Sequence, residues 1–407
     1  MTASWLPDWE RNVWALSLCV FIAFVGFQAF SPFLPIYVRE LGVAEPSRIA
    51  LWSGLLAAVT PAVSGLLAPL FGRLADRFGR KLMLIRSLAG FTVIIAVMGL
   101  VTSVEQLFVA RFVQGLFAGF SPMAMAVASV SAPRDKVSVA IGRVQGAQLL
   151  SVAIGPLAGG VIATRFGTRA AFFVTAGMCA LALIALIFLF QETRALPAGA
   201  ARPTPARTPL RGFLRYPHFV AVMTLLLIAQ FIDRGLALLI PLRVSHMPGV
   251  EAAATSGLII SVAAVGAAAS ANLAARLSQA IPVGRLLLAG FLIGAPLCAA
   301  MALADNWITL LVLRTGVAFC FGGALTLAYS LGGMIVPSES RGAAFGWLAL
   351  GVQFGTAASP LVSGALAAAS MPSAFLMDAG LAWLAAAVLL FGARDLLKRG
   401  DGSDGWR

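Results

Sequence analysis

Residues 72–84 read Gly-Arg-Leu-Ala-Asp-Arg-Phe-Gly-Arg-Lys-Leu-Met-Leu, and they lie between two long apolar stretches. Four basic side chains and one carboxylate are concentrated in this run, and such charges are expensive to place in hydrocarbon. We therefore expect a tight polar turn on one face of a membrane. It is entered through Gly72, which has no side chain and lets two helices approach closely.

The composition supports lipid as the main solvent of this chain. Of its 407 residues, 60% are hydrophobic and 11% are charged, whereas soluble domains carry about a quarter charged residues. The net charge of +13 would suggest nucleic-acid binding in a soluble protein. Here the basic residues fall in short loops rather than on one solvated face, so we expect no nucleic-acid partner.

Twelve apolar runs are each long enough to cross a hydrocarbon core of about 30 Å as a helix. They lie at about 14–37, 50–71, 83–103, 106–130, 141–163, 170–190, 218–242, 253–275, 285–303, 307–331, 343–366 and 372–393. The pattern predicts an all-α, multi-pass membrane protein with 12 transmembrane helices. The first run starts behind Arg11 without a small-residue cleavage site after it, so we expect a retained signal anchor.

Two further features concern orientation and domains. Most of the 29 Lys and Arg residues fall in loops on the side of the N-terminus, which predicts that both termini are cytoplasmic. We expect an N-terminal six-helix bundle at 1–191, a proline-containing cytoplasmic linker at 192–216 and a C-terminal six-helix bundle at 217–407.

An internal repeat supports this division. A shift of 204 residues superposes Pro133 on Pro337, Gly142 on Gly346, Pro156 on Pro360, Leu157 on Leu361 and Gly160 on Gly364. The fifth and eleventh spans, with the loops before them, are therefore copies of one unit in parallel orientation.

One face of the fourth span carries unusual residues. Arg111, Gln114, Gly115 and Gly119 follow the spacing of a single helix face. An arginine inside the membrane is costly unless it is paired or faces water. The alternative is that Arg111 extends to the nearby interface, helped by Glu105.

The fifth span contains Gly155, Pro156, Gly159 and Gly160. Gly155 and Gly159 form a face of small residues suited to close helix packing. Pro156 lacks a backbone N–H and permits a kink. Taken alone, this is a structural motif.

Asp233 lies about 20 Å into the seventh span, at 1.5 Å per residue, between Gln230 and Arg234. A carboxylate at that depth must be protonated or paired. Charge compensation by Arg234 is one alternative, although adjacent helical residues point in different directions. Arg314 mirrors Arg111 to within one residue of the repeat and could instead balance Asp233.

The twelfth span also carries a carboxylate. Asp378 lies only a short way into this span. We expect it to have a helix-entry or interfacial role rather than a role in the centre of the membrane.

Amides and aromatic rings supply the remaining candidates for a binding site, which we expect to be apolar with a few polar anchors. The substrate-binding candidates are Gln28, Phe30, Gln148, Gln230, Phe231 and Gln353. There is no arginine cluster for phosphate and no ladder of carboxylates, so we expect a small-molecule substrate, no metal and no cofactor.

These motifs resemble those of the major facilitator superfamily, and within it the drug:proton antiporter branch of twelve-span bacterial multidrug exporters. Residues 72–84 match the superfamily's loop 2–3 signature position for position, and residues 107–115 match its span 4 motif. Residues 155–160 match the span 5 signature of drug:proton antiporters. The first glycine of that signature is absent from this chain, and Ser151 takes its place.

The resemblance implies the major facilitator fold of two pseudo-symmetric six-helix bundles. It implies proton-coupled export of amphipathic small molecules by alternating access, driven by the proton gradient across a bacterial inner membrane. It also implies a monomer that needs only substrate, protons and the lipid bilayer as partners.

The resemblance also implies roles for individual residues. The proton-coupling candidates are Asp233, Arg111, Gln114 and Arg314; the conformational latch is Gly72, Asp76, Arg77, Gly79 and Arg80; the antiporter packing motif is Gly155, Pro156, Gly159 and Gly160. Asp76 is expected to accept hydrogen bonds at the N-terminus of the eleventh span, near Gly342, where unpaired N–H groups favour a carboxylate.

Two other functions stay open at this point. One is export of a single dedicated metabolite, such as a siderophore, a sugar or an organic acid. The more remote one is a non-transporting membrane protein or a membrane enzyme. We expect no enzymatic activity, because the sequence lacks H-E-x-x-H and G-x-S-x-G motifs and because His218 and His246 lie near helix ends.

Overall fold

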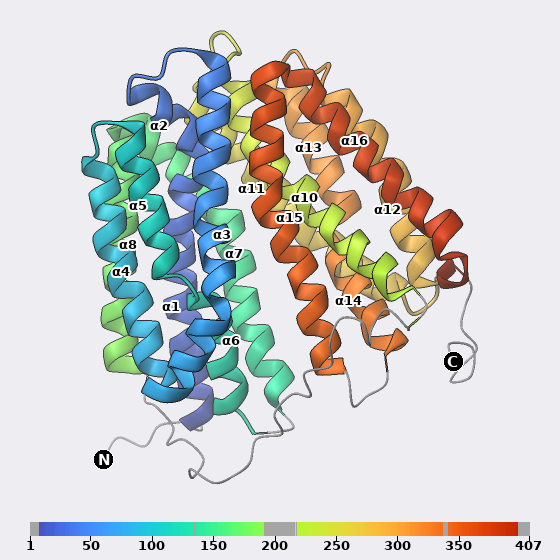
Figure 1. Cartoon of the computed structure of the whole chain (residues 1–407), viewed down its shortest axis with the longest axis horizontal. Helices are drawn as coiled ribbons and strands as arrows, with labels where there is room; N and C mark the ends of the chain where they lie inside the picture. The colour runs from blue at the N-terminus through green and yellow to red at the C-terminus, as the bar shows by residue number, and fades with distance from the viewer. Residues whose placement is uncertain (1–7, 134–135, 191–215, 217, 337–340, 398–407) are drawn as a thin grey trace. The chain divides into compact units, whose positions relative to one another are not determined.

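The structure is a computed structural model that describes residues 8–133, 136–190, 216, 218–336 and 341–397. These residues form helices joined by short connections, without any strand among them (Figure 1). The predicted all-α architecture is therefore confirmed. The expected linker at 192–216 lies outside the described residues, apart from Tyr216.

The helices follow the predicted spans in chain order. In the first half they are α1 (Asp8–Phe30), the 3-10 helix η1 (Ser31–Phe33), α2 (Leu34–Glu40), α3 (Pro46–Phe78), α4 (Arg80–Leu100), α5 (Val104–Leu116), α6 (Phe120–Ser131), α7 (Val137–Phe166) and α8 (Thr168–Leu189). In the second half they are α10 (Phe219–Val244), α11 (Ala252–Leu277), α12 (Val283–Met301), α13 (Trp307–Gly322), α14 (Ala324–Ile335), α15 (Arg341–Ala369), α16 (Met371–Ala387), the π-helix η3 (Val388–Gly392) and η4 (Arg394–Leu397).

Eleven stretches of the described residues are long and apolar enough to cross a membrane. The helix α15, with 29 residues, takes the place of the remaining predicted span. Some spans join two helices, so that α5 and α6 form one of them and α13 and α14 another.

Those joined spans differ from the continuous helices that we expected. The fourth span breaks between Leu116 and Phe120, where Gly119 has a φ of 103°, a conformation that glycine adopts at little cost. The tenth span breaks at Gly323, between α13 and α14. The first span is interrupted at η1, which contains Pro32, because proline cannot donate the backbone hydrogen bond that continues a helix.

A side chain from α4 satisfies the carbonyls at the break in the fourth span. Arg86 donates from Nη1 to Leu116 O at 3.1 Å and from Nη2 to Ala118 O at 3.0 Å. Its guanidinium also lies 4.5 Å from the centre of the Phe71 ring. A cation at the C-terminal end of a helix is favourable because the helix dipole is negative there.

The polar turn at residues 72–84 is shorter than predicted. The helix α3 continues through the charged run to Phe78, and α4 begins at Arg80. Only Gly79, with a φ of 92°, lies outside both helices. Glycine makes this single-residue turn possible, since other residues rarely adopt a positive φ.

The basic residues of this turn bind backbone carbonyls of neighbouring helices. Arg80 donates to Ala126 O at 3.2 Å, and Lys81 donates to Phe190 O at 2.6 Å. Arg77 is exposed and lies against the Phe78 ring. The expected contact of Asp76 with the region of Gly342 lies outside the described residues, as does the environment of Gly72.

The chain divides into two compact units. The first comprises residues 1–44, 55–199 and 250–261, and the second comprises residues 45–54, 200–249 and 262–407. The first turns of α3 therefore group with the second unit, and the first turns of α11 group with the first unit.

In the first unit, α7 packs closely on α1, and the two helices lie side by side in Figure 1. The contact runs along Ser151, Gly155 and Gly159, which are four residues apart. A Cβ atom at Gly159 would lie 1.8 Å from Ala29 O, and one at Gly155 would lie 2.8 Å from Val25 O. Ser151 is fully buried, and its hydroxyl donates to a carbonyl of α1. This face of α7 therefore contacts a helix backbone rather than lipid.

The other side of the same motif contacts the first turns of α11. A Cβ atom at Gly160 would lie 2.8 Å from Ala253 O, and one at Gly257 would lie 2.2 Å from Pro156 O. The N–H of Leu157 donates to Ser261 Oγ at 3.1 Å. The packing motif therefore brings three helix segments of the first unit together.

In the second unit, α15 packs on α10 along an equivalent face. A Cβ atom at Gly355 would lie 2.6 Å from Leu227 O. Here the repeat replaces two glycines of α7 by serines, Ser359 and Ser363, both fully buried. Ser359 donates to Phe231 O at 2.5 Å. The second unit thus has hydroxyl groups where the first has bare backbone.

Candidate functional site

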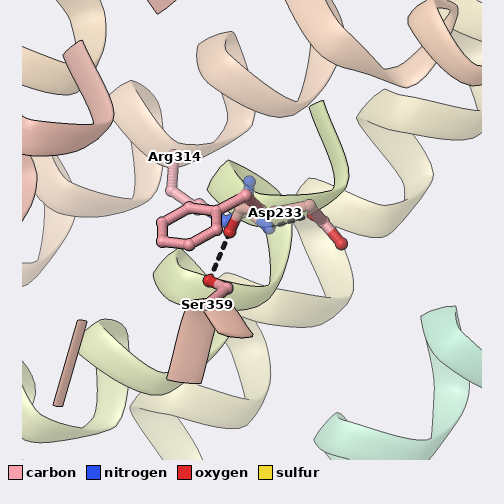
Figure 2. A network of polar contacts seen from close by, with 4 residues as sticks. Asp233, Arg314 and Ser359 are labelled. Atoms are coloured by element: carbon pink, nitrogen blue, oxygen red, sulfur yellow. Dashed lines mark hydrogen bonds and ion pairs between the residues drawn. The ribbon is translucent and has the colours of Figure 1, made fainter. Parts of the chain in front are cut away.

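An ion pair joins α10 and α13 inside the second unit. Arg314 Nη2 lies 2.8 Å from Asp233 Oδ1 and donates a hydrogen bond to it. Figure 2 shows this pair with Ser359 beside it. Of the two partners considered for Asp233, Arg314 forms the ion pair. Arg234 is an exposed residue whose positive charge also acts on Asp233.

The two partners of this ion pair differ in exposure. The Arg314 side chain is 6% exposed and the Asp233 side chain is 50% exposed. An ionised carboxylate is costly to expose to lipid at this depth, so we expect the open side of Asp233 to face water. The pair is thus buried on the side of Arg314 and open on the side of Asp233.

Arg111 holds the equivalent position in the first unit but has different partners. It is 6% exposed. Its Nε donates to Leu56 O at 3.0 Å, and its Nη1 donates to Gln114 Oε1 at 3.0 Å. These contacts hold the guanidinium inside the bundle, so the alternative that it extends to the interface is wrong. Both acceptors are neutral, which leaves the charge of Arg111 less compensated than that of Arg314.

Several other contacts fix this arginine. Thr60 donates to Arg111 O at 2.8 Å, and the Phe30 ring lies 5.8 Å from the guanidinium. A Cβ atom at Gly115 would lie 2.6 Å from Val63 Cβ. Arg111 and Gly115 therefore have different roles on the same helix face. Arg111 forms hydrogen bonds inside the bundle, and Gly115 allows α3 to pack closely against α5.

The position of Asp378 contradicts the interfacial role that we expected. This residue of α16 is 0% exposed. Neither of its carboxyl oxygens has a hydrogen-bond partner among the described residues. Asp378 is close to the start of α16, and that position suggested contact with the membrane interface. Its side chain instead points into the second unit, where it lies next to Gly235 of α10.

The substrate-binding candidates have different surroundings. Phe30, Gln230 and Phe231 are buried and pack within their units. Gln148 is partly exposed and donates to Ser121 Oγ at 2.6 Å. Gln28 is partly exposed, and Gln353 is exposed. The amides of Gln28, Gln148 and Gln353 are therefore the candidates that a ligand can reach in this structure.

Comparison with known proteins agrees with this architecture. A model of the Major Facilitator Superfamily matches residues 16–303 and, in a second overlapping match, residues 251–404. The chain is 31% identical over 372 residues to the multidrug resistance protein MdtG of Citrobacter koseri, covering 90% of this chain and 91% of that protein. It is 30% identical over 364 residues to MdtG of a Rahnella species, covering 89% and 88%.

Solved structures show the same fold at lower identity. One is a bacterial homologue of the human lysosomal transporter Spinster in an inward-facing conformation, with a TM-score of 0.76 and 19% identity, covering 98% of this chain and 100% of that one. Another is the human organic anion transporter MFSD10, with a TM-score of 0.65 and 17% identity, covering 94% and 100%. The family match over nearly the whole length and the relatives above 30% identity lead to one conclusion: the chain belongs to the Major Facilitator Superfamily, a family of membrane transporters.

Proposed function

We propose that the protein exports amphipathic small molecules in exchange for protons, by alternating access of its two halves. The ion pair of Asp233 with Arg314 is the observation that carries this proposal, because it joins a titratable, half-exposed carboxylate to a buried guanidinium. The antiporter-type packing motif of α7 and the multidrug resistance relatives support the direction of transport and the class of substrate. The protein lies in a bacterial inner membrane as a monomer, with both termini cytoplasmic.

The pair can couple proton movement to substrate movement through its charge. With Asp233 ionised, the pair is neutral, and the buried Arg314 is compensated. Protonation of Asp233 breaks this compensation and leaves a buried cation, which is costly. An event that separates the two side chains therefore favours proton uptake, and an event that brings them together favours proton release. A cationic substrate near Asp233 acts like the arginine and also favours release.

Replacement of Asp233 by asparagine tests this coupling. Asp233→Asn keeps the shape of the side chain and removes the titratable group. We expect uphill efflux in proteoliposomes to be lost, while downhill exchange of a neutral substrate stays partly intact. Substrate flux and internal pH would be followed together with fluorescent substrates and a pH-sensitive dye.

An exposed carboxylate provides a matched control. Asp305→Asn makes the same chemical change at a side chain that is 95% exposed, so it should leave uphill efflux unchanged. If Asp233→Asn still concentrates substrate and moves protons as the wild type does, the coupling role of this pair is wrong. A panel of dyes, antibiotics and chelators in the same assay separates broad export from export of one metabolite.

A further inference from the structure

The buried carboxyl group of Asp378 is the feature that the proposed coupling pair leaves unexplained. It is completely buried, and both oxygens are unpartnered among the described residues. An ionised carboxylate without hydrogen-bond donors in an apolar interior costs several kcal/mol. The burial and the missing partners therefore favour the neutral, protonated form of this carboxyl group.

The first unit shows how such a position is filled when no proton is needed. Thr175 and Asp378 each stand seven residues after the first residue of their helix, Thr168 in α8 and Met371 in α16. Thr175 is also fully buried, but its hydroxyl donates to Gly26 O at 2.9 Å. Counted from the start of each helix, α16 thus carries an unsatisfied carboxyl group where α8 carries a satisfied hydroxyl.

Polar groups converge on Asp378 beside a glycine. The place that a Cβ atom would take at Gly235 lies 2.6 Å from Ser363 Oγ, 3.0 Å from Ser359 Oγ and 3.6 Å from Asp378 Oδ1. Ser363 Oγ has no hydrogen-bond partner among the described residues. Asp378 of α16 therefore meets α10 at Gly235, two residues beyond Asp233 along that helix.

One cation is shared by the two carboxyl groups. Arg314 binds Asp233 directly, and it is also within electrostatic range of Asp378. Its Nε is buried and has no acceptor among the described residues. The other titratable groups in the surroundings are the Cys298 thiol of α12, which is near Asp378, and Arg234 of α10, which is exposed. One guanidinium can compensate one carboxylate, so the second carboxyl group must hold a proton.

We propose that Asp378 is a second proton-binding group, which holds a proton while Arg314 is bonded to Asp233 and yields it when Arg314 turns to Asp378. This inference rests on the proposed coupling role of Asp233. In the exchange, an O–H bond breaks at Asp378 and an O–H bond forms at Asp233, while Arg314 changes its acceptor. The summed charge of the three side chains is zero before and after. The half-exposed Asp233 can then pass the proton to water, and the Ser363 hydroxyl lies beside the buried carboxyl group.

Infrared spectroscopy can detect the stored proton directly. A protonated carboxyl group buried from solvent gives a carbonyl stretching band separate from that of a carboxylate. We expect this band in the wild type at neutral pH and in the control Asp305→Asn, whose side chain is 95% exposed. It should be absent in Asp378→Asn. In Asp233→Asn the band should weaken or disappear, because Arg314 has lost its carboxylate partner and can turn to Asp378. A band that is missing in the wild type, or that persists in Asp378→Asn, overturns the inference.

The shared cation gives a second readout. In Arg314→Gln, Asp233 loses its compensating charge and should take up a proton, so the band should grow. The band should grow by the same amount when Arg314→Gln is combined with Asp378→Asn, because the added proton belongs to Asp233. An unchanged band in both backgrounds shows that Arg314 does not control the protons and contradicts the exchange.

Transport assays separate this inference from the proposed function. We expect Asp378→Asn to lower uphill efflux by about tenfold or more while it retains downhill exchange. If Asp233→Asn abolishes uphill efflux and Asp378→Asn transports like the wild type, the second proton site fails and the coupling pair stands. If Asp233→Asn keeps uphill efflux, the coupling pair itself fails. Should Asp378→Asn not accumulate in membranes, Asp378→Thr replaces it, because threonine fills the equivalent position of the first unit.

Discussion

Replacing Gly159 by leucine should abolish transport while the protein still inserts into the membrane. Even the first side-chain atom at this position would lie 1.8 Å from Ala29 O, and backbone atoms cannot turn away as a flexible side chain can. Leucine would therefore force α7 and α1 apart along their whole contact. Insertion should survive because leucine raises the hydrophobicity of the span and so favours its insertion as a transmembrane helix. Dye efflux from cells, normalised to the amount of protein in the membrane, measures the effect.

The same helix offers a matched control for this substitution. A Cβ atom at Gly146 would meet nothing within 4 Å, so Gly146→Leu should transport like the wild type. Gly159→Ala should already impair transport, since the clash begins at Cβ. Normal efflux by Gly159→Leu would show that the close contact of α7 with α1 is not needed for function.

Replacing Arg314 by glutamine should eliminate uphill efflux and destabilise the protein. Removing one partner of a buried ion pair costs about 3–5 kcal/mol, and the open side of Asp233 reduces that cost through solvent screening. Without the guanidinium, Asp233 retains its proton in both states and cannot cycle. Arg314→Lys keeps a positive charge and should retain part of the coupling.

A double mutant separates stability from coupling for this pair. Asp233→Asn added to Arg314→Gln removes the uncompensated carboxyl group, so it should recover thermal stability in detergent relative to Arg314→Gln alone. It should not recover uphill efflux, because no titratable group is left in the pair. Thermal unfolding followed by size-exclusion chromatography gives the first quantity, and proteoliposome transport gives the second. Recovered coupling in the double mutant would contradict the proposed role of Asp233.

The positions of the spans could be predicted from the sequence. Long apolar runs leave little alternative to helices in lipid, because every backbone polar group must be satisfied within the segment. The partner of Asp233 could be narrowed to Arg234 or Arg314, because a carboxylate at that depth needs a nearby cation, but the choice between them needed the structure. The breaks at Gly119 and Gly323 were not predictable in the same way, because glycine is common within continuous transmembrane helices.

The surroundings of Asp378 show where depth along a span is an incomplete guide. Counting residues gives the distance of a side chain from the end of its helix, but it does not tell which way the side chain points. Asp378 is close to the start of α16 and yet fully buried. The sequence contained a usable signal, since Thr175 occupies the same place in the first half. Its significance depends on knowing that this face of the helix is buried.

The glycine seam between α1 and α7 has a consequence for what holds these two helices together. Where other residues carry Cβ, Gly159 has a hydrogen atom that points at Ala29 O, and a Cα–H group this close to a carbonyl forms a weak hydrogen bond. Each such bond contributes about 0.5–1 kcal/mol. At Gly159 the two helices are therefore joined by weak contacts that allow small shifts, whereas at Ser151 the hydrogen bond to Phe21 O fixes them against each other.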